Sequence, residues 1–277
     1  MPALLLALAV HVAAPLAGAG YAFTDWNGVG AATWVGLANF REIFQTEVTR
    51  HALFNTLKLA FVFVVIVNVL GLALALALNR QLKTRHVLRS LFFLPVAMSS
   101  VAIAYIWQYI FQYDGPLNKL LGFLGLDAWK HVWLADPFWA LWTILVVLVW
   151  QYAGLAMVLY LAGLQSIPDE LIEASVVDGA TGWTRFRRVV FPLLAPAFTV
   201  AATLTLVIGL RVFDQVIALT GGGPVNASET LSTQVWEQTW MNGRFGYGAA
   251  LSLLLTLLVG ILVITQTLVL RRRETRA

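Results

Sequence analysis

The sequence predicts an all-α membrane protein that crosses the bilayer several times as a single domain over residues 1–277. Three observations support this fold class: 60% of the residues are hydrophobic, only 12% are charged, and the mean hydropathy is +0.79. A soluble domain carries roughly a quarter charged residues and covers its apolar side chains with polar ones. The chain has no cysteine, which excludes a disulfide framework and thiolate metal sites.

Six apolar runs are long enough, at about 20 residues each, to cross a hydrocarbon core of about 30 Å. The predicted spans are 3–23, 54–78, 91–111, 139–163, 193–212 and 246–270. The first is the weakest, because His11 and Pro15 interrupt it, and a signal peptide is the alternative. No Lys or Arg precedes this run, and Tyr21 and Trp26 follow it as an interfacial aromatic belt would. We therefore expect an uncleaved first helix.

The basic residues predict the orientation, because cytoplasmic loops retain positive charge during insertion. Three segments on one side hold eleven of the 18 Lys and Arg residues: Arg80, Lys83, Arg85 and Arg89; Arg185, Arg187 and Arg188; Arg271, Arg272, Arg273 and Arg276. The loops on the other side hold five. We therefore expect both termini in the cytoplasm of a bacterial cell whose inner membrane holds the chain. This topology also explains the net charge of +4 without a nucleic-acid partner.

The predicted outer loops, 24–53, 112–138 and 215–245, are long enough to meet a partner protein. Within the middle loop, residues 116–126 have the apolar spacing of a short interfacial helix. This helix either covers the membrane surface or contacts a partner. We see no solenoid-type repeat and no separate soluble domain.

The predicted cytoplasmic loop 165–192 has the most specific pattern, QSIPDELIEASVVDGATGWTRFRRVVFP. Pro168 can open a helix that runs to about residue 177, with acidic residues in its first turn where the helix dipole favours them. Gly179 permits a left-handed backbone and hence a sharp turn. A second helix can start near Thr181 and stop at Pro192.

This loop resembles the Glu-Ala-Ala signature of binding-protein-dependent ABC transporter permeases. The matching residues are Glu173, Ala174, Asp178, Gly179, Ala180, Phe186, Val189 and Pro192. Ser175 replaces the second alanine but stays small, and Phe191 replaces the usual leucine. The resemblance implies a coupling helix that fits a groove on an ATP-hydrolysing subunit. Glu173 would then make a polar contact, Ala174 would allow close approach and Gly179 would set the backbone geometry. Taken singly, each could be an ordinary surface or turn residue.

A second segment, FDQVIALTGGGPVNASETL, is similar to the Thr-Gly-Gly-Pro stretch of sugar-type permeases of maltose, lactose and glycerol-phosphate importers. The resemblance covers nearly the whole chain and implies the type I ABC importer permease fold. The implied partners are a second permease, two ABC ATPase subunits, an extracytoplasmic solute-binding protein and membrane lipid. Gly222, Gly223 and Pro224 would form a tight turn that faces the binding protein or a solute, or simply an ordinary loop turn.

Polar residues within the spans are candidates for a solute path, because leaving them in lipid costs on the order of 1–3 kcal/mol each. The candidates are Gln151, Tyr152, Arg211 and Asp214, and Asn68 and Gln108 are two further candidates. Arg211 and Asp214 could pair at i, i+3 on one helix. The alternative role for each residue is to join neighbouring helices.

Other protein classes fit less well. A secondary transporter would place coupling acids near the bilayer centre, where only Asp214 comes close. A membrane enzyme would need a nucleophile, base or metal constellation, yet the four histidines are scattered. A passive channel is disfavoured by the coupling-loop signature alone. The chain also lacks a phosphate-binding Gly-rich loop followed by Lys-Ser or Lys-Thr. We therefore expect a transport subunit without catalytic residues, cofactor or metal, with ATP hydrolysis on a partner.

Overall fold

The computed structural model describes residues 6, 9–80 and 83–274, and most of these residues are helical. The α-helices are α2 (Ala14–Tyr21), α3 (Ala38–Gln45), α4 (Glu47–Leu78), α5 (Arg85–Ala97), α6 (Ser100–Phe111), α7 (Pro116–Phe123), α8 (Trp139–Gln165), α9 (Asp169–Val177), α10 (Gly182–Arg185), α11 (Phe191–Leu193), α12 (Ala195–Leu210), α13 (Asp214–Leu219), α14 (Leu231–Trp236) and α15 (Phe245–Glu274). Short 3-10 or π turns are η1 (Ala9–Ala13), η2 (Asp127–Trp129), η3 (Phe186–Val190) and η4 (Glu237–Met241). The all-α prediction is confirmed.

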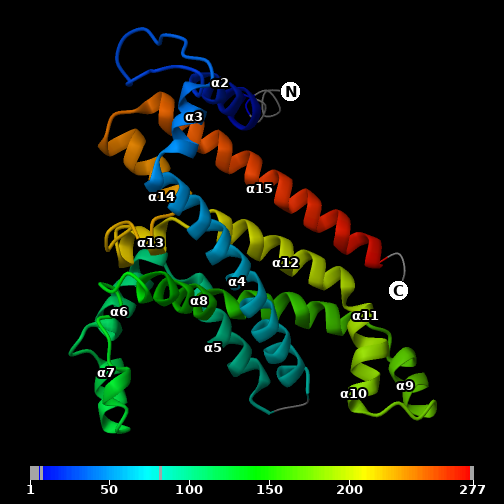
Figure 1. The fold of residues 1–277 in the computed structure, drawn as a ribbon. Coiled ribbons are helices and arrows are strands. Elements are labelled where there is room, and N and C mark those ends of the chain that lie inside the picture. Colours follow the sequence, from blue (N-terminus) through cyan, green and yellow to red (C-terminus); the bar gives the residue numbers. More distant parts are fainter. Residues whose placement is uncertain (1–5, 7–8, 81–82, 275–277) are drawn as a thin grey trace.

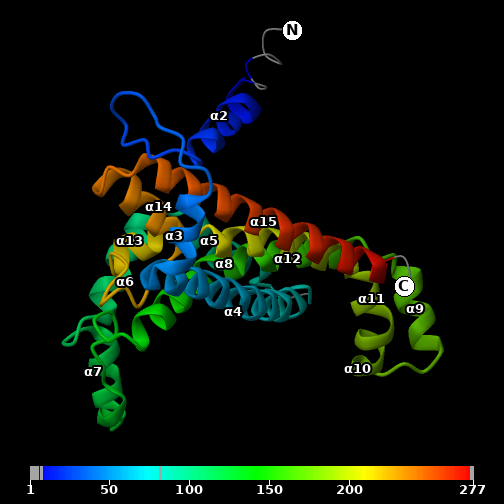
Figure 2. The ribbon, with the colours of Figure 1, turned by 45° about the horizontal axis from the view of Figure 1, so that its top comes forward.

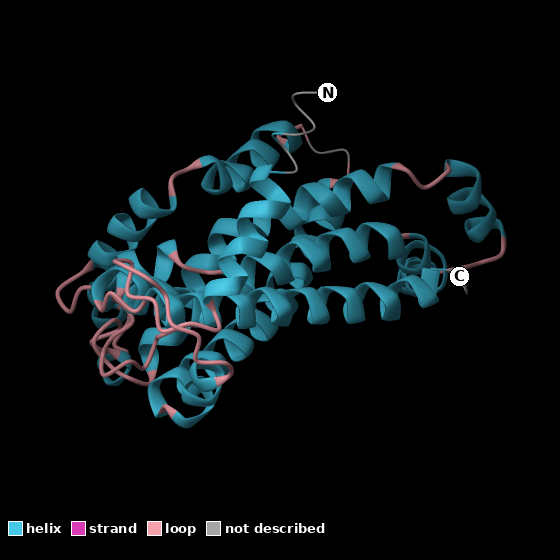
Figure 3. Ribbon diagram, turned by 90° about the horizontal axis from the view of Figure 1, so that it is seen from above, coloured by secondary structure: helices cyan, strands magenta, loops and turns pink. Residues whose placement is uncertain are grey.

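The long helices run side by side, and the segments that connect them lie at the two ends of the bundle (Figure 1). Helices α9 and α10 project from one end, near the end of α15, whereas α13 and α14 lie at the other end in both ribbon views (Figure 2). Seen from above, the longest loops gather at the end far from the C-terminus (Figure 3). The hairpin of α9 and α10 and the longest loops therefore lie at opposite ends of the bundle.

By length and composition, three helices of the described residues can cross a membrane, namely α4, α8 and part of α15. Two bent pairs pass the same test together: α5 with the segment from Ser100 to Phe123, at 100°, and the segment from Gly182 to Leu193 with α12, at 68°. If each pair is one span, the described residues hold up to five spans. The predicted first span, 3–23, lies partly outside the described residues, and its described part forms η1 and α2.

The predicted span 91–111 is interrupted by a break in the helix, because α5 ends at Ala97 and α6 begins at Ser100. Pro95 lies within the last turn of α5, where it cannot donate a backbone hydrogen bond. Met98 and Ser99 are then extended, with ψ of 150° and 133°. As a result, α5 packs along α8, whereas α6 packs against α13.

The second helix of the predicted cytoplasmic loop also continues past its expected stop at Pro192. The helix widens to the π turn η3, in which the Phe191 N–H donates to the Phe186 carbonyl five residues earlier. Proline has no N–H to continue an α-helical ladder, but it is tolerated in the first turn of a new helical segment. The chain therefore runs on to Leu193 and bends only before α12.

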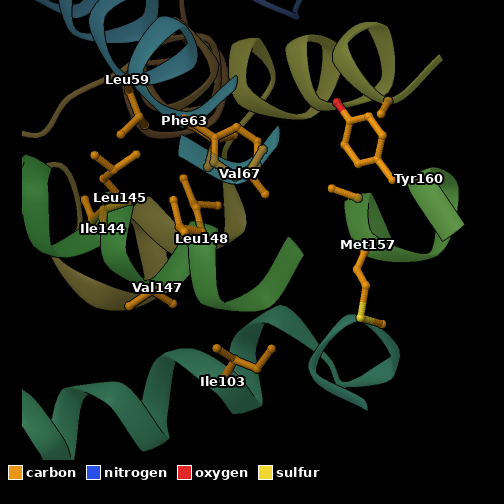
Figure 4. Close-up of a cluster of buried hydrophobic side chains, with 14 of the residues drawn as sticks. Leu59, Phe63, Val67, Ile103, Ile144, Leu145, Val147, Leu148, Met157 and Tyr160 are labelled. Atoms are coloured by element: carbon orange, nitrogen blue, oxygen red, sulfur yellow. The ribbon is translucent and has the colours of Figure 1, made fainter. Parts of the chain in front are cut away.

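The core forms where α4 and α8 pack lengthwise, with α5 and α12 on either side. Its largest buried side chains include Phe63, Ile144, Leu148 and Met157 (Figure 4). Glycine brings the α8 and α5 backbones close, because a Cβ on Gly154 would lie 1.9 Å from the Phe92 carbonyl oxygen. This part of the bundle is therefore packed backbone against backbone.

A buried polar network joins three of these helices. The Tyr160 hydroxyl donates to Asn68 Oδ1 at 2.7 Å, and Asn68 Nδ2 donates to Thr205 Oγ1 at 2.9 Å. Gln108 likewise donates to the Ala218 carbonyl at 2.6 Å, from α6 to α13. For Asn68 and Gln108, the structure therefore supports helix joining, one of the two roles that the sequence left open.

Candidate coupling loop and solute cavity

The predicted coupling loop forms a short helical hairpin at one end of the bundle (Figures 1 and 2). Its first helix, α9, ends in a Schellman motif: the Ala180 N–H donates to the Ser175 carbonyl, and the Gly179 N–H donates to the Val176 carbonyl. Gly179 takes φ of +75°, which confirms its expected left-handed backbone. Nothing lies within 4 Å of a Cβ built there, so the conformation, and not crowding, requires glycine.

The other signature residues divide between the surface and the base of the hairpin. Glu173, Ala174 and Asp178 are exposed, as a docking surface requires. Ser175 is buried and its hydroxyl donates to the Ile172 carbonyl at 2.6 Å, so its small size serves packing inside the hairpin. Ala180 is half-buried at the turn. The remaining three positions, Phe186, Val189 and Pro192, are half-buried in the second arm.

The hairpin also exposes apolar side chains next to the signature residues. Val177 is 87% exposed, and Val176 beside it is 54% exposed. Trp183, on the second arm, is 71% exposed and stacks on Phe186 with ring centroids 5.7 Å apart. No local signal identified Val176 and Val177, since an apolar pair before Asp178 fits a buried position as well as an exposed one. Exposed apolar residues next to Glu173 are typical of a protein-binding surface.

A polar cavity of about 310 Å³ lies between α8, α12 and the segment that joins α12 to α13. Three of the four predicted solute-path residues line it, namely Tyr152, Arg211 and Asp214. Ser100, Phe213 and Gln215, which the sequence did not indicate, complete its polar and aromatic lining. Ser100 lies inside the predicted span 91–111, directly after the break between α5 and α6, and Gln215 lies beyond the predicted span 193–212.

The fourth predicted residue, Gln151, lies behind the cavity wall. It is 2% exposed, and its Oε1 accepts a hydrogen bond of 2.8 Å from Gln215 Nε2. The same Gln215 nitrogen donates to Ser100 Oγ at 3.2 Å. Gln151 therefore holds Gln215 in place and reaches the cavity only through it.

Arg211 and Asp214 do not share a helix, contrary to the expected i, i+3 arrangement. Helix α12 ends at Leu210, and α13 begins at Asp214. The ion pairs of the described residues join His51 to Glu47, Lys130 to Asp127 and Arg244 to Glu42. Arg211 and Asp214 are both exposed at the cavity, so their charges remain open to a solute or a partner.

The glycine-rich loop lies at the other end of the bundle, between α13 and α14. Gly222 is buried, Gly223 and Pro224 are half-buried, and the Gly223–Pro224 peptide bond is cis. Val225 and Asn226 form the exposed tip, both with positive φ. The surface that this loop offers is therefore centred on Val225 and Asn226, and Gly222 faces inward.

Hydrogen bonds anchor the loop to α4. Asn55 Nδ2 donates to the carbonyls of Ala227 and Glu229 at 3.0 Å each, and Thr56 Oγ1 accepts from the Leu231 N–H at 2.9 Å. Thr230 caps α14 by accepting from the Thr233 N–H. Among the described residues, no group of three or more His, Asp or Glu side chains could hold a metal ion.

Comparison with known proteins decides the family. Residues 67–275 match the family described as binding-protein-dependent transport system inner membrane component. The chain belongs to this family. The permease prediction is thus confirmed, and the membrane location with several crossings follows from it. Members are transport subunits, and ATP hydrolysis is the task of a separate ATPase subunit.

Several relatives of this permease are sugar transport proteins. It is 34% identical to the probable starch degradation products transport system permease protein AmyD of Thermoanaerobacterium thermosulfurigenes, covering 98% of this chain and 92% of that one. It is also 34% identical to the trehalose/maltose permease MalF of Thermococcus litoralis, over 82% and 76% of the two chains. These similarities confirm the sugar-type subfamily.

Solved structures of the family share the fold of this permease. A chain of a bacterial ABC transporter involved in the import of the acidic polysaccharide alginate superimposes with a TM-score of 0.86, at 25% identity over 98% of this chain and 93% of that one. A bacterial alginate transporter in complex with a periplasmic protein bound to an alginate pentasaccharide gives a TM-score of 0.85. The type I importer permease fold is therefore confirmed.

Proposed function

We propose that this permease forms half of the translocation pathway for a sugar or related small polar solute, and that its hairpin couples the pathway to a separate ATPase. One observation carries the proposal: the two helices that flank the hairpin both line the polar cavity. Helix α8 contributes Tyr152 and ends directly before the hairpin, and α12 starts after the hairpin and contributes Val207 and Ile208. About 20 Å of helix separates Tyr152 from the end of α8.

This arrangement connects the hairpin to the cavity mechanically. A helix transmits displacement along its axis, and switching proteins move such rigid elements as units. When an ATPase subunit moves the hairpin, α8 and α12 shift together, and the cavity walls shift with them. Exposure of the cavity to alternate sides of the membrane would follow from that movement.

The lining suits a hydroxyl-rich solute. Ser100 and Tyr152 offer hydroxyl groups, Arg211 donates hydrogen bonds and Asp214 accepts them. The aromatic rings offer apolar faces to the C–H side of a sugar ring. The named substrates of the relatives, among them starch degradation products, trehalose and maltose, support this class.

We also propose the partners and the orientation. A second permease would close the open side of the cavity, two ABC ATPase subunits would bind the hairpins, and an extracytoplasmic solute-binding protein would meet the end with Val225 and Asn226. The alginate transporter with its bound periplasmic protein supports the last contact. The hairpin and both termini would be cytoplasmic, as the distribution of Lys and Arg indicates.

The test of coupling compares Gly179→Val with Gly182→Val, in chains tagged after Ala277 and purified in mild detergent. Both glycines are free of contacts to a Cβ, but Gly179 has positive φ and Gly182 does not. We expect Gly179→Val to lose the ATPase subunit from the purified complex and Gly182→Val to retain it. If both variants retain an equal amount of ATPase, the hairpin is not the coupling element.

The test of the cavity replaces Asp214 with Asn, which keeps its size and removes its charge. We expect solute uptake to fall at least tenfold while the complex still assembles, because about 1.4 kcal/mol of lost interaction is a factor of ten. Glu47→Gln serves as the control, since Glu47 is an exposed acid at the start of α4. Unchanged uptake in Asp214→Asn would remove Asp214 from the solute path.

A further inference from the structure

Glu229 is a buried carboxyl group in the glycine-rich loop, outside the membrane-spanning helices. It is 3% exposed. Its Oε1 accepts from Gln234 Nε2 at 3.2 Å, and its Oε2 lies 3.1 Å from Thr233 Oγ1. No cation pairs with it among the ion pairs of the described residues. A buried carboxylate without a cation is costly, and such groups are stabilised by taking up a proton.

A second acid faces the same donor. Gln234 Nε2 also donates to Glu237 Oε2, at 3.1 Å, so one amide group bridges two carboxyl groups. The other neighbours that the loop contacts are not ionisable: Asn55 and Thr56 on α4, and Thr220 at the end of α13. Glu237 is therefore the charge that Glu229 faces, and it has the same sign.

The hydrogen bonds around Thr233 fit a protonated Glu229. The Thr233 hydroxyl has one proton and two lone pairs. It accepts from the Thr230 N–H at 2.8 Å and lies 2.9 Å from the Thr230 carbonyl. If Glu229 Oε2 carries a proton, Glu229 donates to Thr233 and Thr233 donates to Thr230. Every partner is then satisfied, whereas an ionised Glu229 competes with the Thr230 carbonyl for one proton.

The glycine turn rests directly on this carboxyl group. A Cβ on Gly222 would lie 2.3 Å from Glu229 Oε2, so only glycine permits the contact. The turn is closed by hydrogen bonds from the Ser228 N–H to the Gly222 carbonyl and between the hydroxyls of Thr220 and Ser228. Movement of Glu229 would therefore displace the segment that carries the exposed tip.

We propose that Glu229 is a protonatable positioning residue, which holds the tip at Val225 and Asn226 in one conformation when its carboxyl group carries a proton and frees the tip when that proton is lost. Any effect of this switch on the docking of a binding protein rests on the proposed function, in which that protein contacts the tip. The hydrogen bonds, the buried Glu229 next to the half-buried Glu237, and the contact with Gly222 carry the proposal by themselves.

The direction of the pH dependence follows from the surroundings. Burial, and next the negative Glu237, raise the pKa of the Glu229 carboxyl from 4.5 to about 7. The conformation in which Glu229 holds the tip binds the proton more tightly than the conformation in which the tip is free. The stability of the held conformation is therefore greatest below about pH 4.5 and is lost as the pH rises through about 7. The tip should be ordered in mildly acidic surroundings and mobile in alkaline ones.

The experiment uses a spin label at Val225→Cys, the only thiol in a chain without cysteine. The assembled transporter, without binding protein, is placed in lipid nanodiscs and its electron paramagnetic resonance line shape is recorded from pH 5 to 9. We expect an immobilised label at low pH that becomes mobile with a midpoint near 7. Glu229→Gln, which mimics the protonated group, should remain immobilised throughout, and Glu229→Ala should remain mobile.

Two further variants establish whether the midpoint belongs to the Glu229 carboxyl group. Glu237→Gln removes the facing charge and should move the midpoint to lower pH, which keeps the proposal testable if Glu229 variants fail to assemble. Glu47→Gln, an exposed acid on α4 outside the loop, should leave the midpoint unchanged. A pH-independent line shape in the parent, or an unchanged midpoint in Glu229→Gln or Glu237→Gln, would overturn the proposal. Since no binding protein is present, failure of the proposed docking would appear only in a separate binding measurement.

Discussion

Replacing Gly154 with alanine should destabilise the bundle at the contact between α5 and α8. The new Cβ would lie 1.9 Å from the Phe92 carbonyl oxygen, about 1.5 Å short of the 3.4 Å at which ordinary van der Waals contact begins. The obstacle is backbone and cannot rotate away, so the two helices must separate. Overpacking of this kind costs about 1–3 kcal/mol, and the higher helix propensity of alanine offsets up to about 1 kcal/mol. A net loss of roughly 1–2 kcal/mol is expected.

For a chain of this length, that loss corresponds to a Tm about 2–8 °C lower. The measurement is the fraction of assembled complex that survives heating, followed by size-exclusion chromatography in one detergent. Gly260→Ala is the matched control, because it gains the same helix propensity on α15 with nothing within 4 Å of its Cβ. If Gly154→Ala and Gly260→Ala give the same Tm, α8 does not lie against the backbone of α5 and the packing argument fails.

Three other predictions concern contacts between elements. Asn68→Leu should lower stability by about 1–3 kcal/mol, because it leaves the buried Tyr160 hydroxyl without its partner; Tyr160→Phe in the Asn68→Leu background should then cost little more, in a thermal double-mutant cycle. Glu42→Gln should lower the free energy of unfolding by less than about 1 kcal/mol, because the ion pair of Glu42 with Arg244 is half-exposed. This difference should vanish at high salt, which screens the pair. Arg244→Lys should cost a similar amount, since lysine cannot form the two-bond contact that Arg244 makes.

Local rules allowed the sequence to predict the coupling hairpin closely. The structure places the first helix at Asp169–Val177, against an expected 168–177, because proline, early acids and a following glycine mark helix ends without help from distant residues. Gly179 has the left-handed φ that its place after Asp178 predicted. The same rules could not show that Val177 points outward, since that depends on what the rest of the chain leaves uncovered.

The bends between consecutive helices could not be predicted from the sequence. Composition identified residues 91–111 as apolar, but an apolar run has the same composition whether it is straight or turns by 100° at Met98 and Ser99. That turn brings Ser100 to the cavity, and the break before Asp214 does the same for Gln215. The cavity is made where helices end, so its lining could be predicted only in part from residues inside the spans.

Helix α15 is a long apolar helix that the rest of the chain covers only in part. None of its most apolar 18-residue stretch is buried against the rest of the chain. A newly inserted copy thus packs α15 along α12 on one side and leaves apolar side chains such as Ile261, Ile264 and Leu268 exposed, so that the bilayer must cover them. Stability of an isolated copy in detergent would then depend on how well the micelle imitates lipid around this helix. Overproduced copies without their partners should accordingly be the first substrates for membrane proteases, and the amount of assembled transporter should follow the scarcest subunit.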